Sequence, residues 1–288
     1  MGILIEKESY NLNETLHSGQ AFRWNKSHSP TNHERVLHEG IIDGVRVRLV
    51  QSQNAVEIIT PPSNKHLRNL LYKYLAINHD LEAFYKEFSK DQYLSNSIQT
   101  YRGLHILRQD PWECLISFIC SANNNIPRIK SLVESISVGC GTPVTDDLGT
   151  YYSFPTPKQL NDFGEQSLRG IGLGFRAKYV AKASAMIDSG QISLEHLKTL
   201  DYNAALAELL KIPGVGDKVA NCVLLFSLEK LDSFPVDVWI NRVMKETYIK
   251  EAGIELPNNA IRGWAQTKFG PFAGYANQYL FHARRMNN

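Results

Sequence analysis

The fold prediction for this chain depends on the stretch Leu209-Leu210-Lys211-Ile212-Pro213-Gly214-Val215-Gly216-Asp217-Lys218-Val219-Ala220. It predicts one helix, a tight Pro-Gly-Val-Gly turn and a second helix, which together make a helical hairpin over residues 204–228. The amides around Gly214 and Gly216 are expected to point outward from the positive end of the second helix, where they can bind a phosphate. An ordinary helical hairpin would explain a bare Gly-x-Gly equally well, and the length of the full string favours the phosphate site.

An acidic residue precedes the next predicted helix. Asp237 stands 19 positions after Lys218, in Phe234-Pro235-Val236-Asp237-Val238-Trp239. Helix capping alone would explain this carboxylate, and a lysine in a first helical turn is most often solvated. A lysine and an aspartate at the starts of successive helices can also converge on one crevice, and that arrangement suits nucleophilic chemistry by an amine.

Both residues lie in a long helical region that begins at Asp110. The sequence Asp110-Pro111-Trp112-Glu113 combines a capping carboxylate, a proline at the first helical position and a glutamate at the third, which is a helix start signal. A buried stripe of Leu115, Ile116, Ile119 and Cys120 follows. The spacing of apolar residues predicts an essentially all-helical domain over residues 110–288, with further helices over residues 129–137, 176–187, 203–210, 218–228, 238–248, 258–268 and 273–284.

Residues 1–109 are predicted to form an α+β domain with an antiparallel sheet. Two strands, over residues 35–42 and 45–50, flank Asp43-Gly44, which is a strong hairpin signal. A third strand over residues 56–60 is expected to end at Pro61-Pro62. Two short amphipathic helices follow, one from Leu67 to Leu75 and one from Leu81 to Phe88.

Composition limits the class of function. The chain has 288 residues, and its 31 basic and 29 acidic side chains leave a net charge of +2. This near balance argues against a binder that coats nucleic acid through charge alone, so any such contact must be local. No run approaches the roughly 18 apolar residues of a membrane span, and no targeting or lipidation signal is recognised, so we expect a cytoplasmic protein.

Cysteine and histidine spacing argue against a metal or disulfide framework. The four cysteines have no C-x-x-C spacing, and the nine histidines show no pairing typical of metal ligands. We therefore expect reduced thiols, no metal and no cofactor. The cysteines are Cys114, Cys120, Cys140 and Cys222.

Several separated motifs carry a resemblance to a known family. The chain resembles the 8-oxoguanine DNA glycosylase/AP lyase family of the helix-hairpin-helix DNA glycosylase superfamily over nearly its whole length. Besides the hairpin and the Pro-Val-Asp motif, the matching stretches are residues 18–24 (SGQAFRW), 107–111 (LRQDP), 117–126 (SFICSANNNI) and 172–177 (GLGFRA). The resemblance implies a sheet domain similar to the TATA-binding protein, followed by the helical domain. No cysteine follows Cys222, which excludes the cluster of the iron–sulfur relatives.

The resemblance implies catalytic roles for Lys218 and Asp237. Lys218 would attack the anomeric carbon of the sugar and form a Schiff base, after which β-elimination cuts the strand. Attack requires a neutral amine, which a partly desolvated site near a positive helix end favours. Asp237 would stabilise positive charge developing on the sugar or assist proton movement.

A base pocket is also implied. The carbonyl of Gly19 would accept the hydrogen that N7 of the oxidised base gains, while Cys222 and Phe281 would sandwich the flipped base; core packing is the alternative for the latter two. Asn277 stands where eukaryotic relatives carry a Gln that reads the Watson–Crick edge. We favour Asn277 for this role, with Gln278 as the adjacent alternative.

Other residues would contact the DNA. Asn123 would fill the space that the flipped base vacates, Arg128 and Arg176 would read the unpaired cytosine, and Phe175 would be the wedge. The hairpin residues Gly214, Val215 and Gly216 would hold a phosphate. Trp239 departs from the family because eukaryotic relatives carry a phosphate-contacting His there, and the neighbours Asn241 or Arg242 are candidates to replace that contact.

The resulting expectation is a monomeric bifunctional enzyme of base excision repair. It would excise 8-oxoguanine from duplex DNA, preferentially opposite cytosine. Formamidopyrimidines or a looser choice of opposite base are alternatives that keep the same chemistry. A non-catalytic module that senses damaged DNA is a third, which the presence of both Lys218 and Asp237 argues against.

Overall fold

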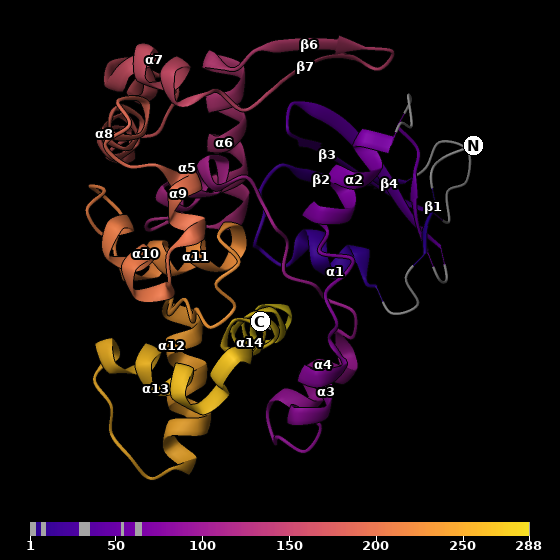
Figure 1. Cartoon of the computed structure of the whole chain (residues 1–288), viewed down its shortest axis with the longest axis vertical. Coiled ribbons are helices and arrows are strands. Elements are labelled where there is room, and N and C mark those ends of the chain that lie inside the picture. Colours follow the sequence, from indigo (N-terminus) through magenta and orange to yellow (C-terminus); the bar gives the residue numbers. More distant parts are fainter. Residues whose placement is uncertain (1–3, 7–9, 29–34, 53–54, 61–64, 288) are drawn as a thin grey trace.

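The computed structural model describes residues 4–6, 10–28, 35–52, 55–60 and 65–287, and it has a sheet-containing part and a helical part (Figure 1). The sheet has five antiparallel strands in the order β1-β5-β4-β3-β2. The strands are β1 (Leu4–Glu6), β2 (Trp24–His28), β3 (Val36–Ile42), β4 (Val45–Ser52) and β5 (Ala55–Ile58).

The predicted hairpin at Asp43-Gly44 is confirmed. Both turn residues have positive φ, 49° and 72°, as a two-residue turn between twisted antiparallel strands requires. The expected stop at Pro61-Pro62 lies outside the described residues, and β5 ends at Ile58. The sequence did not predict β1 and β2, because neither shows a clear alternation of apolar and polar residues.

One apolar cluster joins this sheet to two helices. α1 (Leu12–His17) and α2 (Lys65–Tyr74) contribute buried residues that pack with those of the strands. Trp24 of β2 is 1% exposed, and its indole nitrogen donates to the Tyr74 hydroxyl at 2.9 Å. This hydrogen bond attaches β2, the strand that follows Gly19, to α2.

The helical part centres on α5 (Pro111–Cys120), which contacts α6, α8, α9 and α11. Its predicted start is confirmed, because the Asp110 carboxylate accepts from the Glu113 amide at 2.8 Å. The other helices are α3 (Glu82–Phe88), α4 (Leu94–Thr100), α6 (Ile126–Cys140), α7 (Pro157–Gly170), α8 (Arg176–Asp188), α9 (Leu194–Thr199), α10 (Tyr202–Leu209), α11 (Asp217–Ser227), α12 (Val238–Met244), α13 (Ile261–Phe269) and α14 (Ala273–Met286).

The expectation of an all-helical second region was wrong at one place. Residues 143–152 form a hairpin of β6 (Pro143–Asp146) and β7 (Gly149–Tyr152) that extends from the helical part to the sheet (Figure 1). The Tyr151 hydroxyl donates to the Gly44 carbonyl at 3.1 Å, and Arg46 pairs with Asp146 at 3.2 Å. These contacts lie between residues about 100 positions apart, so local sequence patterns do not reveal them.

The last helix also joins the two parts. Within the helical part, α14 packs on α12, α13 and α4, and the Tyr279 hydroxyl lies 3.0 Å from that of Tyr85 in α3. At its other end, Arg285 donates to the His17 carbonyl in α1. α14 thus brings residues from the end of the chain beside the turn at Gly19.

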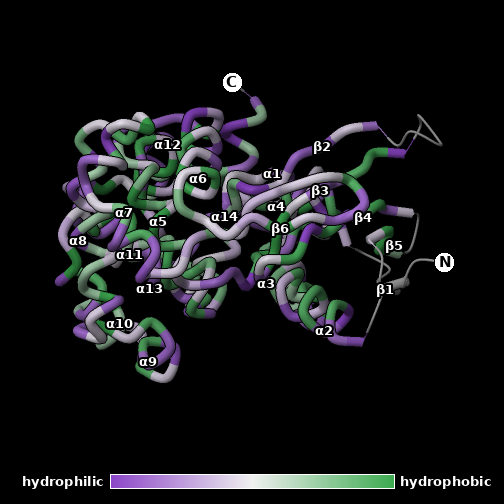
Figure 2. The backbone as a smooth tube through the Cα atoms, turned by 90° about the horizontal axis from the view of Figure 1, so that it is seen from above, coloured by the Kyte–Doolittle hydropathy of each residue, from purple (hydrophilic) through white to green (hydrophobic). Residues whose placement is uncertain are grey.

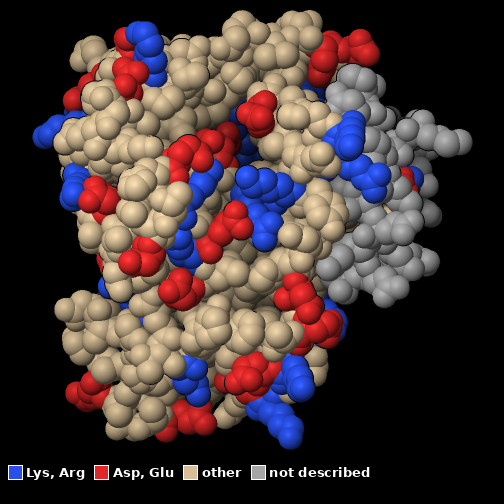
Figure 3. Space-filling model, viewed as in Figure 1, with Lys and Arg blue, Asp and Glu red and all other residues tan. Residues whose placement is uncertain are grey.

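The helices are amphipathic (Figure 2), and the charged side chains on the surface are of both signs (Figure 3). Hydrophobic and hydrophilic residues alternate along the helices (Figure 2), and basic and acidic side chains are interspersed on the face shown in Figure 3. None of the described helices has both the length and the apolar character needed to cross a membrane.

Candidate active site

Lys218 lies in the first turn of α11 and faces the end of α5. Its Nζ donates to Ser121 Oγ at 2.9 Å and lies 4.9 Å from the centre of the Phe118 ring. Ser121 caps the C-terminus of α5, and α5 packs against α11. The amine is therefore held between two helices, and the residue is half-buried.

Asp237 caps the next helix, as the sequence predicted. Its carboxylate accepts from the Ile240 amide at 2.8 Å at the start of α12. Burial raises the pKa of Asp237, while the Ile240 amide and the charge of Lys218 act in the opposite direction. Lys218 is therefore close enough for its charge to act on the Asp237 carboxylate.

Cys222 lies one helical turn after Lys218 and completes this group. It is 3% exposed, and burial raises the pKa of its thiol to about 11, with Lys218 lowering it and Asp237 raising it. The thiol is therefore neutral near pH 7. The structure thus brings Lys218 and Cys222 of α11 together with Asp237 at the start of α12.

A second group forms at Gly19, where α14 meets the loop after α1. Gly19 has a φ of +86°, and a Cβ at this position would lie 3.2 Å from the Phe281 ring and 3.1 Å from Ile126 Cδ1. Glycine is required both by this backbone conformation and by the close approach. Gly19 and Phe281 are therefore neighbours, as a shared base pocket would need.

The two adjacent amides of α14 have different partners. Asn277 Nδ2 donates to the Pro235 carbonyl at 2.8 Å, two residues before Asp237. Gln278 Nε2 donates to the Ser18 carbonyl at 3.3 Å, directly before Gly19. Asn277 thus belongs with the Asp237 segment and Gln278 with the Gly19 turn, and both side chains are buried.

The hairpin turn supplies backbone amides. Gly214 has a φ of +87°, and a Cβ there would lie 2.5 Å from the Tyr179 ring. The Val215 amide is bonded to the Ile212 carbonyl at 3.0 Å, and its side chain is 6% exposed. Among the described residues the amides of Gly214 and Gly216 have no acceptor, so these two amides are available to an anion.

The predicted DNA contacts gather where α5, α6 and α8 meet. Arg176 donates through Nε to the Ala122 carbonyl at 2.9 Å and through Nη2 to that of Asn123 at 2.9 Å. Arg128 Nη2 donates to the Gly172 carbonyl at 3.0 Å. Phe175 is 50% exposed, and the Arg176 guanidinium lies 4.5 Å from its ring centre.

Asn123 and Trp239 complete the set of predicted residues. Asn123 is exposed and has a φ of +47°, a conformation that asparagine adopts more readily than most residues. The Trp239 ring lies 5.9 Å from the guanidinium of Arg242, one of the two residues suggested as its replacement in phosphate contact.

Sequence reasoning missed two residues of these groups. Ser121, the partner of Lys218, lies inside a family-like stretch but received no role, although a hydroxyl at a helix end was a usable signal. Arg285 Nη1 lies 3.3 Å from the position of a Gly19 Cβ. No local sequence pattern links Arg285 to Gly19, because 266 positions separate them.

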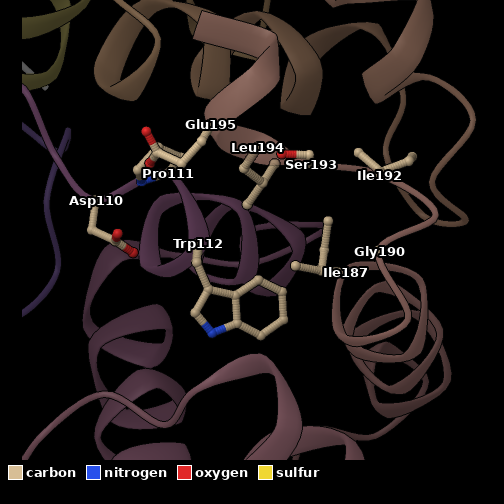
Figure 4. A pocket seen from close by; sticks show the side chains of 9 residues that line it. All are labelled: Asp110, Pro111, Trp112, Ile187, Gly190, Ile192, Ser193, Leu194 and Glu195. Atoms are coloured by element: carbon tan, nitrogen blue, oxygen red, sulfur yellow. The ribbon is translucent and has the colours of Figure 1, made fainter.

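A separate surface pocket of about 310 Å³ opens at the starts of α5 and α9 (Figure 4). None of the predicted site residues lines it. Its walls are Asp110, Pro111, Trp112, Ile187, Gly190, Ile192, Ser193, Leu194 and Glu195. The candidate chemistry therefore lies elsewhere, at the junction of α5, α11, α12 and α14.

Known families and relatives match both parts of the chain. Residues 2–115 match the family model "8-oxoguanine DNA glycosylase, N-terminal domain", and residues 116–259 match "HhH-GPD superfamily base excision DNA repair protein". A probable N-glycosylase/DNA lyase of Methanothermobacter thermautotrophicus is 31% identical over 96% of this chain and 94% of its own length. The Arabidopsis thaliana N-glycosylase/DNA lyase OGG1 is 33% identical over 93% of this chain and 76% of its own length.

A solved structure is similar across the whole fold. The Clostridium acetobutylicum 8-oxoguanine glycosylase/lyase, crystallised with double-stranded DNA containing cytosine opposite 8-oxoG, has a TM-score of 0.89 and 34% identity. The match covers 99% of this chain and 98% of the other. Both the sheet part and the helical part are included in this similarity.

Proposed function

Because this chain belongs to the 8-oxoguanine DNA glycosylase/lyase family of helix-hairpin-helix base excision repair enzymes, we propose that it excises 8-oxoguanine from duplex DNA, preferentially opposite cytosine. Formamidopyrimidines are expected as further substrates. The observation that carries the proposal is that Lys218, Cys222 and Asp237 act on one another's charge, while Asn277 and Gln278 of α14 connect the Asp237 segment to the Gly19 turn.

Lys218 is the nucleophile in this proposal. Its neutral amine attacks C1′ of the damaged nucleotide, the N9–C1′ bond breaks, and the base leaves with the bonding electrons and takes up a proton. The sugar ring then opens to a Schiff base between Nζ and C1′. Loss of a proton from C2′ expels the 3′ phosphate by β-elimination and cuts the strand.

Asp237 acts as the carboxylate that stabilises the sugar as the bond to the base breaks. Positive charge develops on the sugar in that step, and a fixed negative charge nearby lowers its energy. The Ile240 amide holds the carboxylate in place, and the first turn of α12 favours its charged form. The neutral thiol of Cys222 supplies a polarizable wall of the pocket without adding a second negative charge.

The flipped base is accommodated between Cys222 and Phe281, with the Gly19 carbonyl as the acceptor for N7–H. Guanine has no hydrogen at N7, so its lone pair would face the lone pairs of the carbonyl. Asn277 or Gln278 reads the Watson–Crick edge. The hydrogen bond of Asn277 to Pro235 supports its placement beside Asp237, where the base is attached to the sugar.

The remaining residues hold the distorted DNA. Arg128 and Arg176 present guanidinium groups suited to the two acceptors of cytosine, and Asn123 fills the vacated stack. Phe175 is exposed and flat, as a wedge between base pairs must be. The free amides of Gly214 and Gly216 contact a phosphate of the damaged strand.

Borohydride trapping tests the proposal. Duplexes carrying one 8-oxoguanine opposite each of the four bases are incubated with the wild type or with Lys218→Gln. A covalent product that requires Lys218 and is strongest opposite cytosine is expected. If no duplex gives a trapped product, the protein is a binder or a glycosylase without lyase activity, and Lys218 is not the nucleophile.

A further inference from the structure

Arg285 is a second charged group at the Gly19 turn. It lies in the last turn of α14, and its Nη2 donates to the His17 carbonyl at 2.5 Å and lies 3.1 Å from His282 Nδ1. His282 is itself paired with Glu14 through its other ring nitrogen. The plane of the guanidinium is therefore fixed against the backbone that leads into Gly19.

The other terminal nitrogen of Arg285 is free to donate. Nη1 lies 3.3 Å from the position of a Gly19 Cβ, beside the edge of the Phe281 ring. It has no acceptor among the described residues, although Nη2 of the same side chain has two contacts. The charged donor Arg285 Nη1 thus lies next to the turn at Gly19, whose carbonyl is proposed to accept the N7–H of the base.

The oxidised imidazole edge of a purine has the matching pattern. 8-Oxoguanine has a donor at N7 and, on the adjacent atom, an acceptor at O8; formamidopyrimidines keep the same N7–H and C8=O pair. Guanine instead has an acceptor at N7 and a C–H at C8. An acceptor and a charged donor side by side in the protein therefore fit the N7–H and C8=O groups of the oxidised bases. They match guanine at neither N7 nor C8.

We infer that Arg285 is a specificity-determining residue that donates from Nη1 to the C8 oxygen of the flipped base while the Gly19 carbonyl accepts N7–H. The inference rests on the proposed function, because it requires that the flipped base enter the pocket at Gly19 and Phe281. It defines the substrate class as purine lesions with adjacent N7–H and C8=O groups, whether the imidazole ring is closed or open.

Arg285 also braces the Gly19 turn, and the test must separate the two roles. 8-Thioguanine keeps N7–H but replaces O8 with sulfur, a much weaker acceptor. If Arg285 only supports the Gly19 turn, its loss should slow excision of both bases equally. If it donates to the atom bonded to C8, its loss should matter much more for oxygen than for sulfur. Comparing the two bases in wild type and variant isolates the contact, as a double-mutant cycle does.

The experiment measures single-turnover excision of 8-oxoguanine and 8-thioguanine by wild type, Arg285→Met and Arg285→Lys. Arg284→Met is the matched control, because Arg284 precedes Arg285 on the same helix and pairs with Glu246 at 3.1 Å. Arg285→Met is expected to slow excision of 8-oxoguanine by about 10- to 100-fold, the effect of losing one hydrogen bond from a charged donor. The loss for 8-thioguanine should be several times smaller, and Arg285→Lys should recover part of the rate.

Equal losses for both bases, or no loss for either, would overturn the inference. Cleavage of a duplex that already contains an abasic site shows whether each variant is folded and able to form the Schiff base. Failure of the wild type to excise 8-oxoguanine would instead refute the proposed function, so the two failures are distinguishable.

Discussion

The Nζ atom of Lys218 lies 2.9 Å from Ser121 Oγ, and the hydroxyl of Ser121 donates its own hydrogen to the Phe118 carbonyl at 2.6 Å. Ser121 can therefore only accept from the amine. When Lys218 is neutral, one N–H points to Ser121 and the lone pair is directed elsewhere. Ser121 thus orients the nucleophile without consuming its reactive electron pair.

Removing this hydroxyl should slow the covalent step. Ser121→Ala is expected to reduce the single-turnover rate of borohydride trapping by about 3- to 10-fold, the effect of one neutral hydrogen bond. The affinity for DNA should stay close to that of the wild type, and Ser121→Thr should restore part of the rate. Ser135→Ala is a suitable control because the bond of Ser135 Oγ to the Ser131 carbonyl lies within α6, away from Lys218. A weaker affinity with an unchanged rate would contradict this role.

The pH dependence of base excision should report Asp237. Burial raises the pKa of this carboxyl above its ordinary value of 3.8, and the mechanism requires the charged form. Activity should therefore fall as the pH drops through a pKa higher than 3.8. Asp237→Asn should lower the rate at every pH and abolish this acid limb while keeping the helix cap. Asp201→Asn, which changes the equivalent cap of α10, should leave the profile unchanged.

Selection of the opposite base should depend on Arg176. Replacing it with alanine removes one of the two guanidinium groups, Arg128 and Arg176, that are proposed to contact the acceptors of cytosine, an interaction of about 1 to 3 kcal/mol. We expect the preference for cytosine over the other three bases to fall about 10-fold in single-turnover excision. Arg102→Ala is the control, because Arg102 pairs with Glu82 in α3, away from the residues proposed to contact the DNA. A cytosine preference that survives in the Arg176 variant would refute this assignment.

Two glycines of the hairpin turn should respond differently to alanine. Gly214 combines a φ of +87° with a Cβ position 2.5 Å from the Tyr179 ring, so Gly214→Ala is expected to cost about 1 to 3 kcal/mol of stability and to weaken DNA binding. Gly216 has a φ of −94° and nothing within 4 Å of its Cβ position. Thermal unfolding and DNA affinity of Gly216→Ala should therefore stay near wild type. Equal effects of both changes would be inconsistent with the observed turn.

Glu113 should make the stability depend on pH. Burial raises its pKa to about 7 from 4.5, so the folded state holds a proton that the unfolded chain releases. The free energy of unfolding should consequently decrease as the pH rises from about 4.5 to about 7, by roughly 2 to 3 kcal/mol from this residue. Glu113→Gln should flatten this part of the curve when melting temperatures are compared between pH 5 and 8. Identical slopes for wild type and variant would exclude the effect.

Local chemistry was sufficient to predict much of the architecture. Asp43-Gly44 specified a hairpin because both positions need positive φ, and Asp110-Pro111 specified the start of α5 because its carboxylate caps the helix. Asp237 was predicted as a cap for the same reason. The short strands β6 and β7 were missed because their stability comes from contacts with the sheet, such as Tyr151 with Gly44.

The sequence by itself determined the helical hairpin, the positions of Lys218 and Asp237 at helix starts, and the family resemblance. These features depend on neighbours a few residues apart, whose hydrogen bonds and backbone preferences act locally. Only the tertiary structure decided that Lys218 rests on Ser121, that Asn277 and Gln278 have different partners, and that Arg285 stands beside Gly19. Those contacts join distant parts of the chain and exist only because packing of α5 on α11, and of α14 beside α1, brings them within hydrogen-bonding distance.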